Sequence, residues 1–400
     1  SLKKNNIKED ILILTATSGD TGKAALEGFK NLNQIKIIVF FPEDGVSSIQ
    51  KLQMQSQEGN NTYVVSINGN FDDAQSAVKT IFNDEEFKEI LKNNNYILSS
   101  ANSINIGRLL PQIVYYFYSY FDLVKNKHIK LKDKINFTVP TGNFGNILAA
   151  YYAKLMGLPV NKLICTSNDN NVLYDFFNSG IYNKNRELIL TSSPSMDILI
   201  SSNLERLLFE ISSRDSEKVN NLIKDLNNKG LYKLDANMKK NLNSFRSEYA
   251  NELEVKRNIN KVFKEYNYLI DTHTCVAYTS YMKYLKKHKD CTPTVIVSTA
   301  SPYKFSKDVL YSLGEEVNNF DKFEIIEKLS TMLKPNRLQH SINVANCAVK
   351  LSEIYSYDKD KAYLAGLVHD CAKYFTKDQV DFYVKKYNIF SFINQQFYDI

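Results

Sequence analysis

Short apolar or β-branched runs alternate with helical stretches along most of this chain. The runs that have the character of buried strands cover residues 11–16, 35–41, 62–67, 96–100, 135–139, 162–166 and 294–298. The intervening stretches with helical periodicity cover residues 23–30, 47–56, 72–82 and 106–123. Strands that alternate with helices form parallel sheets whose two faces are covered. The pattern therefore predicts an α/β fold with parallel sheets.

Two later stretches break this alternation. Residues from about 198 to 284 are charged, rich in Asn and Lys, and mostly helical in period, with no clear strand. We interpret them as a helical insertion on the α/β body. After about residue 321 the pattern is helical throughout. The sequence thus predicts an α/β region at residues 1–320 and an all-α region at residues 321–400.

Composition excludes several classes of protein. The net charge is +6 with both signs interspersed, whereas nucleic-acid binding shows a clustered basic stripe. No apolar run approaches the roughly 18 residues of a membrane helix, and no signal peptide begins the chain. Five cysteines are scattered without a CxxC pair, which indicates a reducing compartment. We expect a cytoplasmic protein with no nucleic-acid or membrane partner, whose oligomeric state the sequence does not determine.

Two glycine-containing loops each follow a strand and open a helix. The first is Thr-Ser-Gly-Asp-Thr-Gly at residues 17–22, and the second is Thr-Gly-Asn-Phe-Gly-Asn at residues 141–146. Small residues there let backbone N–H groups approach an anion, which the helix dipole also favours. Tight turns need glycine for steric reasons as well, so one such loop alone is weak evidence. Two loops in one α/β body favour a bound phosphate ester, and neither is a Walker A loop.

The two loops belong to a series of colinear motifs that resembles threonine synthases of the bacterial and fungal type. Together the motifs extend over about 310 residues and occur in the family's order. The matching segments are residues 14–25, 41–47, 100–112, 142–146, 194–198, 201–206, 271–274 and 298–305.

This resemblance implies a three-layer, fold-type-II pyridoxal-phosphate (PLP) enzyme. Such enzymes convert O-phospho-L-homoserine and water to L-threonine and phosphate, with PLP as electron sink. If the roles of the matching family residues apply here, Thr299 faces the pyridine nitrogen and Asp20 faces the pyridine 3′-oxygen. The residues that would hold the cofactor phosphate are Gly142, Asn143, Phe144, Gly145 and Asn146.

The same resemblance implies a binding site for the small-molecule substrate. Its candidate residues are Ser18, Ser103, Asn105 and Arg108. An arginine suits a phosphate ester because it can bind two oxygens at once. The alternative for Arg108 is a surface ion pair at a helix start. Asp271 and His273 are expected to have packing or hydrogen-bonding roles only.

One residue that the family requires has no match in this sequence. The family's Schiff-base lysine lies in a Phe-Lys-Asp motif upstream of the Thr-Ser-Gly-Asp-Thr-Gly loop. The residues before Thr17 contain no such motif, and Lys88, Lys264 and Lys307 have different surroundings. The resemblance therefore implies that the family's N-terminal domain is absent. We assign no catalytic residue and expect little or no threonine synthase activity.

The C-terminal region contains a histidine motif of a second kind. Residues 337–341 read Arg-Leu-Gln-His-Ser, and residues 367–373 read Leu-Val-His-Asp-Cys-Ala-Lys. Both resemble the HD superfamily, in particular bacterial hydrolases of symmetrical diadenosine tetraphosphate. The resemblance implies that His340, His369 and Asp370 are ligands of iron or another divalent metal that activates water. No His follows His369, so a partial site and a plain helical remnant both stay open.

Four interpretations of function therefore stand. The first is threonine synthase, and the second is another type-II PLP lyase, against which the substrate-phosphate motif argues. The third is a metal-dependent HD phosphohydrolase of dinucleoside polyphosphates. The fourth is a non-catalytic module that binds a phosphorylated ligand. Because both regions match only part of their families, we expect an excerpt of a longer fused chain or a chimeric gene.

Overall fold

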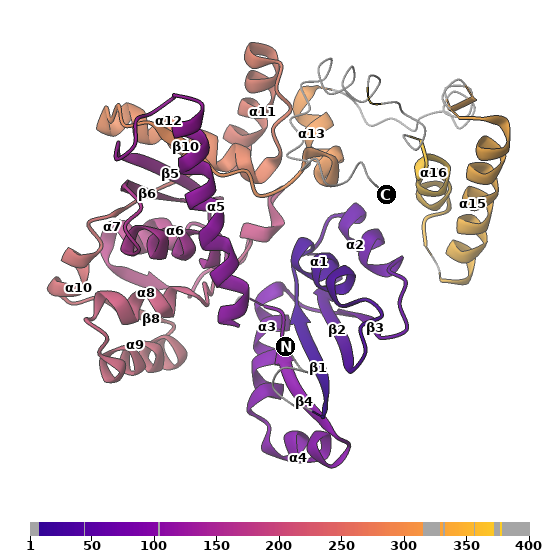
Figure 1. Ribbon diagram of the computed structural model, residues 1–400, viewed down its shortest axis with the longest axis horizontal. Helices are drawn as coiled ribbons and strands as arrows, with labels where there is room; N and C mark the ends of the chain where they lie inside the picture. The colour runs from indigo at the N-terminus through magenta and orange to yellow at the C-terminus, as the bar shows by residue number, and fades with distance from the viewer. Residues whose placement is uncertain are drawn as a thin grey trace. The chain divides into compact units, whose positions relative to one another are not determined.

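The computed structural model describes residues 8–43, 45–102, 105–314, 329–330, 333–355, 357–371 and 377. The chain divides into two compact units (Figure 1). The first unit comprises residues 1–259 and 270–309, and the second comprises residues 260–269 and 310–400. The predicted boundary between residues 320 and 321 lies outside the described residues.

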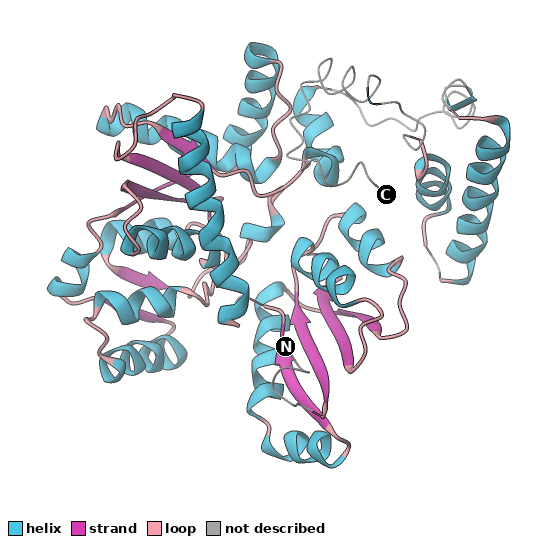
Figure 2. Ribbon diagram, in the orientation of Figure 1, coloured by secondary structure: helices cyan, strands magenta, loops and turns pink. Residues whose placement is uncertain are grey.

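The first unit contains a parallel sheet with strand order β3-β2-β1-β4 (Figure 2). The strands are β1 (Asp10–Ala16), β2 (Ile35–Pro42), β3 (Thr62–Ile67) and β4 (Tyr96–Ser100). The helices that connect them are α1 (Asp20–Phe29), α2 (Ser48–Gln55), α3 (Phe71–Asn83) and α4 (Glu85–Asn93). Successive side chains of a strand point to opposite faces. Ile13 accordingly belongs to a core cluster with Leu26 and Met54, and Leu14 to one with Ala74 and Val78.

A second parallel sheet in the same unit has strand order β10-β5-β6-β9. Its strands are β5 (Ile135–Pro140), β6 (Val160–Ser167), β9 (Phe245–Tyr249) and β10 (Thr294–Ile296). The helices around it include α5 (Ile106–Lys125), α6 (Gly145–Leu155), α7 (Val172–Ser179) and α12 (Thr272–His288). β5 is buried along its whole length, as expected of a strand covered on both faces. The predicted α/β fold with parallel sheets is confirmed.

The predicted helical insertion is largely helical, but it contains strands. Its helices include α8 (Leu204–Ile211), α9 (Ser216–Lys229), α10 (Ala236–Asn241) and α11 (Glu252–Tyr266). A short antiparallel pair joins β7 (Ile181–Asn183) to β8 (Leu231–Lys233), and β9 pairs with β6. The expectation of a segment without strands was therefore wrong. β9 reads Phe-Arg-Ser-Glu-Tyr, which lacks a β-branched run, and its pairing with β6 makes it a strand.

The second unit contains two helices that pack together. They are α15 (Pro335–Ile354) and α16 (Lys359–Val368), around a small core that includes Leu333, Ala345 and Leu367. A Cβ atom on Gly366 would lie 2.6 Å from the Cα of Ala345. Glycine therefore permits the close approach of the two helices. Among the helices that the structure describes, none combines the length and apolarity needed to cross a membrane.

Candidate functional site

The loop between β5 and α6 presents backbone N–H groups that have no hydrogen-bond acceptor in the part of the chain that the structure describes. Helix α6 begins at Gly145, after Phe144 in the left-handed region at φ 65°. The first N–H groups of a helix have no intrahelical acceptor. Within the described residues, no oxygen accepts a hydrogen bond from the N–H of Gly142, Asn143, Phe144 or Gly145. Together with the helix dipole, these donors form an anion cradle.

The cradle is held from one side by the segment after the short 3-10 helix η2 (Pro194–Met196). The backbone N–H of Ser202 donates to Asn143 Oδ1 at 2.8 Å, and the Ser202 hydroxyl donates to the same atom at 2.6 Å. Asn203 donates to the carbonyl oxygen of Asn143 from its backbone N–H and from Nδ2. Asn143 Nδ2 in turn donates to Gln75 Oε1 at 2.8 Å. The conformation of the cradle therefore depends on this strip of chain.

Gly142 has a steric role in the same packing. A Cβ atom at this position would lie 2.2 Å from the backbone carbonyl oxygen of Ser195. Real Cβ atoms do not approach a backbone atom this closely, so any side chain would displace the loop. The Ser201 hydroxyl also donates to the Gly142 carbonyl at 2.8 Å.

The loop between β1 and α1 is closed by a buried hydroxyl. Thr17 Oγ1 accepts from the N–H groups of Gly19 and Gly22 at 2.9 and 2.8 Å. Ser18 lies half-buried within this turn. Gly19 adopts φ 134°, a conformation that favours glycine. The loop therefore has a fixed shape at the carboxyl end of β1.

Asp20, the first residue of α1, is held by two donors. Its Oδ1 atom accepts from Gln50 Nε2 and from Lys304 Nζ, both at 2.9 Å. Lys304 lies in the 3-10 helix η3 (Pro302–Phe305). Sequence reasoning gave Lys304 no role, although the residue lies in the matched motif at 298–305. A charged lysine in a motif whose other residues are mostly small or apolar was the feature from which a role for Lys304 could have been predicted.

The start of α5 presents a half-buried cation. Asn105 caps the helix by accepting from the Gly107 N–H at 2.9 Å. Arg108 follows one turn on, and burial lowers the pKa of its guanidinium. No carboxylate among the described residues forms an ion pair with Arg108, so the alternative of a surface ion pair is not seen there. Ser103, the other candidate of this motif, lies outside the described residues.

The strand order of the two sheets brings the candidate loops and helix starts described above together in two groups. β1 and β4 are parallel neighbours, so the loop after β1 and the start of α5 lie at the same sheet edge. Asn102 ties the two, because its side chain bonds the N–H and the carbonyl of Ala16 at 2.8 and 2.6 Å. β5 and β10 are likewise parallel neighbours, and Thr299, which is exposed, follows β10. The Lys304–Asp20 ion pair connects the two groups.

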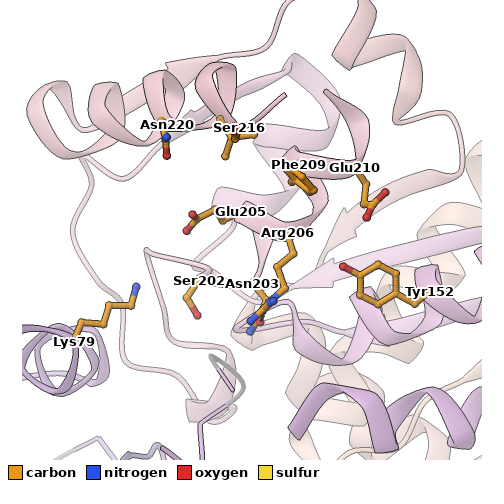
Figure 3. A pocket seen from close by; sticks show the side chains of 11 residues that line it. Lys79, Tyr152, Ser202, Asn203, Glu205, Arg206, Phe209, Glu210, Ser216 and Asn220 are labelled. Atoms are coloured by element: carbon orange, nitrogen blue, oxygen red, sulfur yellow. Dashed lines mark hydrogen bonds between the residues drawn. The ribbon is translucent and has the colours of Figure 1, made fainter. Parts of the chain in front are cut away.

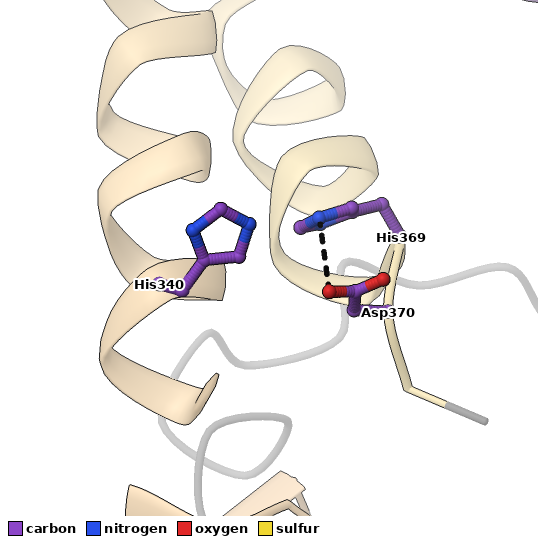
Figure 4. A group of neighbouring side chains, drawn as sticks. All are labelled: His340, His369 and Asp370. Atoms are coloured by element: carbon purple, nitrogen blue, oxygen red, sulfur yellow. Dashed lines mark ion pairs between the residues drawn. The ribbon is translucent and has the colours of Figure 1, made fainter. Parts of the chain in front are cut away.

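In the second unit, the three predicted metal ligands lie together (Figure 4). One ligand atom each from His340, His369 and Asp370 lies within 4.8 Å of the others. His369 Nδ1 lies 2.8 Å from the Gly366 carbonyl, which assigns a proton to Nδ1 and leaves the Nε2 lone pair for a metal. Asp370 also forms an ion pair with Arg337 at 3.2 Å. This donor set fits a divalent cation, and Asp370 would then contact both the metal and Arg337.

Comparisons with known proteins give the family. A model of the HD domain matches residues 337–396. Human threonine synthase-like 1 is 42% identical over 316 residues, which cover 77% of this chain and 42% of the human protein. Threonine synthase from Saccharomyces cerevisiae is 37% identical over 346 residues, which cover 82% of this chain and 66% of the yeast enzyme. This chain belongs to the threonine synthase family. It spans less than half of the human relative and about two thirds of the yeast enzyme.

Solved structures of threonine synthase agree with the fold. The PLP-bound enzyme from Brucella melitensis has a TM-score of 0.69 and 38% identity, over 80% of this chain and 66% of that chain. The threonine synthase region thus belongs to a family of PLP-dependent lyases, and it is followed by an HD domain. The assignments to the threonine synthase family and to the HD superfamily are confirmed.

Asp271 and His273 make structural contacts in the threonine synthase region. Asp271 caps α12 by accepting from the N–H groups of His273 and Thr274 at 2.9 and 3.1 Å. His273 is buried, and its Nε2 accepts from the Ser195 N–H at 3.2 Å. These contacts hold η2 against the cradle, and they are packing and hydrogen-bonding contacts of the kind predicted for both residues.

Asp197, in the motif after η2, is a buried carboxylate that sequence reasoning passed over. Its two oxygens accept from Thr191 N and Oγ1 at 2.8 and 2.7 Å, and from the side-chain amides of Asn168 and Asn170 at 2.7 and 2.9 Å. Burial raises the pKa of Asp197 to about 6, although these hydrogen bonds act to lower it. The motif Pro-Ser-Met-Asp at 194–197 was the available signal.

The raised pKa predicts how stability depends on pH. Because the folded state binds the Asp197 proton more tightly than the unfolded state, the associated stability is present at acid pH and is lost as pH rises through about 6. We expect wild type to lose about 1 kcal/mol more unfolding free energy than Asp197→Asn between about pH 5 and pH 7. Urea unfolding at both pH values measures this difference. An identical pH dependence in the two proteins would contradict the assignment.

Proposed function

We propose that the threonine synthase region binds PLP and O-phospho-L-homoserine in the reaction that forms L-threonine and phosphate. The observation that carries the proposal is the set of N–H groups from Gly142 to Gly145 at the start of α6, which have no acceptor among the described residues. A phosphate ester matches these donors in charge and in hydrogen bonding. The scattered cysteines, all free, support a cytoplasmic setting.

The residues present fit PLP. The phosphate would lie on the N–H groups of residues 142–146, with no carboxylate among the residues of that loop. Asp20 would face the 3′-oxygen, and its charge is balanced by Lys304 at 2.9 Å. The Thr299 hydroxyl is exposed and is free to face the pyridine nitrogen. When bound, PLP supplies the electron sink that lets the Cα and Cβ protons and the Cγ phosphate leave before water adds at Cβ.

The side chains of this chain would bind and orient the substrate. Arg108 would hold the substrate phosphate through two parallel hydrogen bonds, next to the helix start capped by Asn105. Ser18 and Ser103 would complete the substrate contacts. Lys304 would hold the Asp20 carboxylate in position through their ion pair at 2.9 Å. No residue of the 400 is assigned to proton transfer, because none of the lysines lies in a Phe-Lys-Asp motif.

Replacing Arg108 tests the substrate site. We expect Arg108→Gln to weaken O-phospho-L-homoserine binding about tenfold or more, since a charge-assisted bidentate contact is lost. Titration calorimetry of the PLP-loaded chain measures this affinity. The matched control is Lys125→Gln, which removes one positive charge from the other end of α5 and should leave the affinity unchanged. Equal affinities for wild type and Arg108→Gln would remove Arg108 from the site.

A second candidate function rests on the HD unit, which we propose is a metal-dependent phosphohydrolase that acts on dinucleoside polyphosphates. The supporting observation is the convergence of His340, His369 and Asp370 within 4.8 Å, with His369 Nδ1 already engaged by a carbonyl. Iron or another divalent cation on these groups would lower the pKa of a bound water.

The close approach of α15 and α16 predicts how that site can be broken without touching a ligand. Gly366→Val would place side-chain carbons against the backbone of Ala345 and push His369 away from His340. We expect Mn²⁺ affinity, measured by calorimetry, to fall about tenfold or more, as it would in His340→Ala. Ala365→Val, an exposed neighbour on the same helix, is the control. Unchanged Mn²⁺ affinity in Gly366→Val would show that the helix contact does not build the site.

A further inference from the structure

A cavity in the first unit lies beside the cradle, and none of the residues that line it is assigned to cofactor or substrate binding in the proposed reaction. It has a volume of about 520 Å³ and opens between α3, α6, α8 and α9 (Figure 3). A cavity of this size accommodates a small metabolite. Polar side chains from each of these elements line it, among them Lys79, Tyr152, Ser202, Arg206 and Asn220.

The walls of this cavity present charges of both signs. Lys79 and Arg206 contribute cations, and Glu205 and Glu210 contribute carboxylates. In Figure 3, Lys79 and Arg206 reach toward Ser202 from opposite sides, while Glu205 lies between Ser202 and α9. Glu210 is paired with Arg214 at 3.3 Å. Among the described residues, neither Lys79 nor Glu205 has an ion-pair partner.

The presence of both a cation and a carboxylate in the cavity wall favours one class of ligand. A simple anion would satisfy Lys79 and leave Glu205 facing a like charge, and a simple cation would do the reverse. A zwitterion of the α-amino-acid type places a carboxylate and an ammonium group within reach of both. The hydroxyl and amide groups of Ser202, Ser216 and Asn220 add hydrogen-bonding partners.

The cavity is connected to the cradle through one strip of chain. Ser202 and Asn203 line the cavity, and the same two residues hold Asn143 through its side chain and its carbonyl. A smaller adjoining cavity shares Lys79, Ser202 and Glu205 and reaches Ser201. The Ser201 hydroxyl donates to the Gly142 carbonyl. A ligand that moves residues 201–203 therefore moves the donors of the cradle.

We propose that this cavity is a second site, which binds an α-amino-acid zwitterion and alters the affinity of the cradle for PLP. L-Threonine is the probe of choice, a choice that rests on the proposed function because it would be the product of the reaction. The factor by which L-threonine changes the affinity for PLP equals the factor by which PLP changes the affinity for L-threonine. The coupling can therefore be measured with either ligand.

Calorimetric titration of the full chain with L-threonine tests the site. We expect saturable binding that Lys79→Gln and Glu205→Gln each weaken about fivefold, since both side chains are exposed and partly screened. The matched controls are Lys92→Gln and Glu86→Gln on α4, which should bind as wild type does. Absence of binding at millimolar L-threonine overturns the proposal. So does binding that Arg108→Gln abolishes and that Lys79→Gln and Glu205→Gln leave intact, because the ligand then occupies the substrate site.

The coupling has its own measurement. The dissociation constant of PLP is determined with and without saturating L-threonine, in wild type and in Lys79→Gln. We expect a change of about threefold or more in wild type that is lost in Lys79→Gln. An unchanged PLP affinity overturns the coupling. If PLP does not bind at all, the proposed function is wrong. L-Threonine binding in the cavity is then still tested separately by the calorimetric titration.

Discussion

Replacing Gly142 with alanine is expected to abolish measurable PLP binding. The added Cβ would lie 2.2 Å from the Ser195 carbonyl oxygen, which is a backbone atom and cannot rotate away. Either the cradle or the segment around η2 must move, and both carry hydrogen bonds that fix the cradle donors. We also expect a loss of about 2 kcal/mol of unfolding free energy, typical of overpacking at a buried contact.

Equilibrium dialysis of PLP and urea unfolding measure the two effects. Gly28→Ala is the matched control, because Gly28 lies inside α1 and an added Cβ meets nothing within 4 Å. Alanine favours a helix interior over glycine by about 1 kcal/mol, so the control should be as stable as wild type or more stable. PLP binding of wild-type strength in Gly142→Ala would show that the phosphate lies elsewhere.

A polypeptide of these 400 residues is expected to convert O-phospho-L-homoserine at least about 10⁴-fold more slowly than yeast threonine synthase assayed beside it. The reason is chemical: the family's lysine both forms the Schiff base and moves protons, and losses of such groups cost rates of this order. We still expect PLP to bind through the cradle. This combination, binding without turnover, separates a PLP-binding module from a working enzyme.

Phosphate release from O-phospho-L-homoserine, followed with and without added PLP, is the measurement. A rate within about tenfold of the yeast enzyme would contradict the expectation. It would mean that a lysine among these residues takes the role, and Lys304, which lies 2.9 Å from Asp20, would be the first to replace. Lys304→Arg should then lose the activity, while Lys88→Arg on α4 should keep it.

The sequence pattern was sufficient to predict the parallel sheets, because buried strands and amphipathic helices differ in the spacing of their apolar residues. β5 is apolar enough to be recognised alone, and the structure buries all of it. β9 was missed because Arg246, Ser247 and Glu248 interrupt its apolar character. Its identity as a strand comes from pairing with β6, which is a tertiary effect that local pattern does not encode.

The same limit applies to the site. The two glycine loops are local features and were recognised from their spacing. The partners that shape them are distant in sequence: Lys304 reaches Asp20, and Gln75 holds Asn143. In the HD unit, His340 and His369 were recognised from their motifs, and the structure brings them within reach of one metal. Gly366 permits the close approach of α15 and α16, and this role appears only when the two helices are packed.

A crystal structure of the chain grown with PLP tests the central claim most directly. The account predicts the PLP phosphate on the backbone N–H groups of Gly142 to Gly145, with the 3′-oxygen toward Asp20 and the ring nitrogen toward Thr299. Phosphate density at any other place in the first unit, with the cradle N–H groups facing solvent, would contradict it.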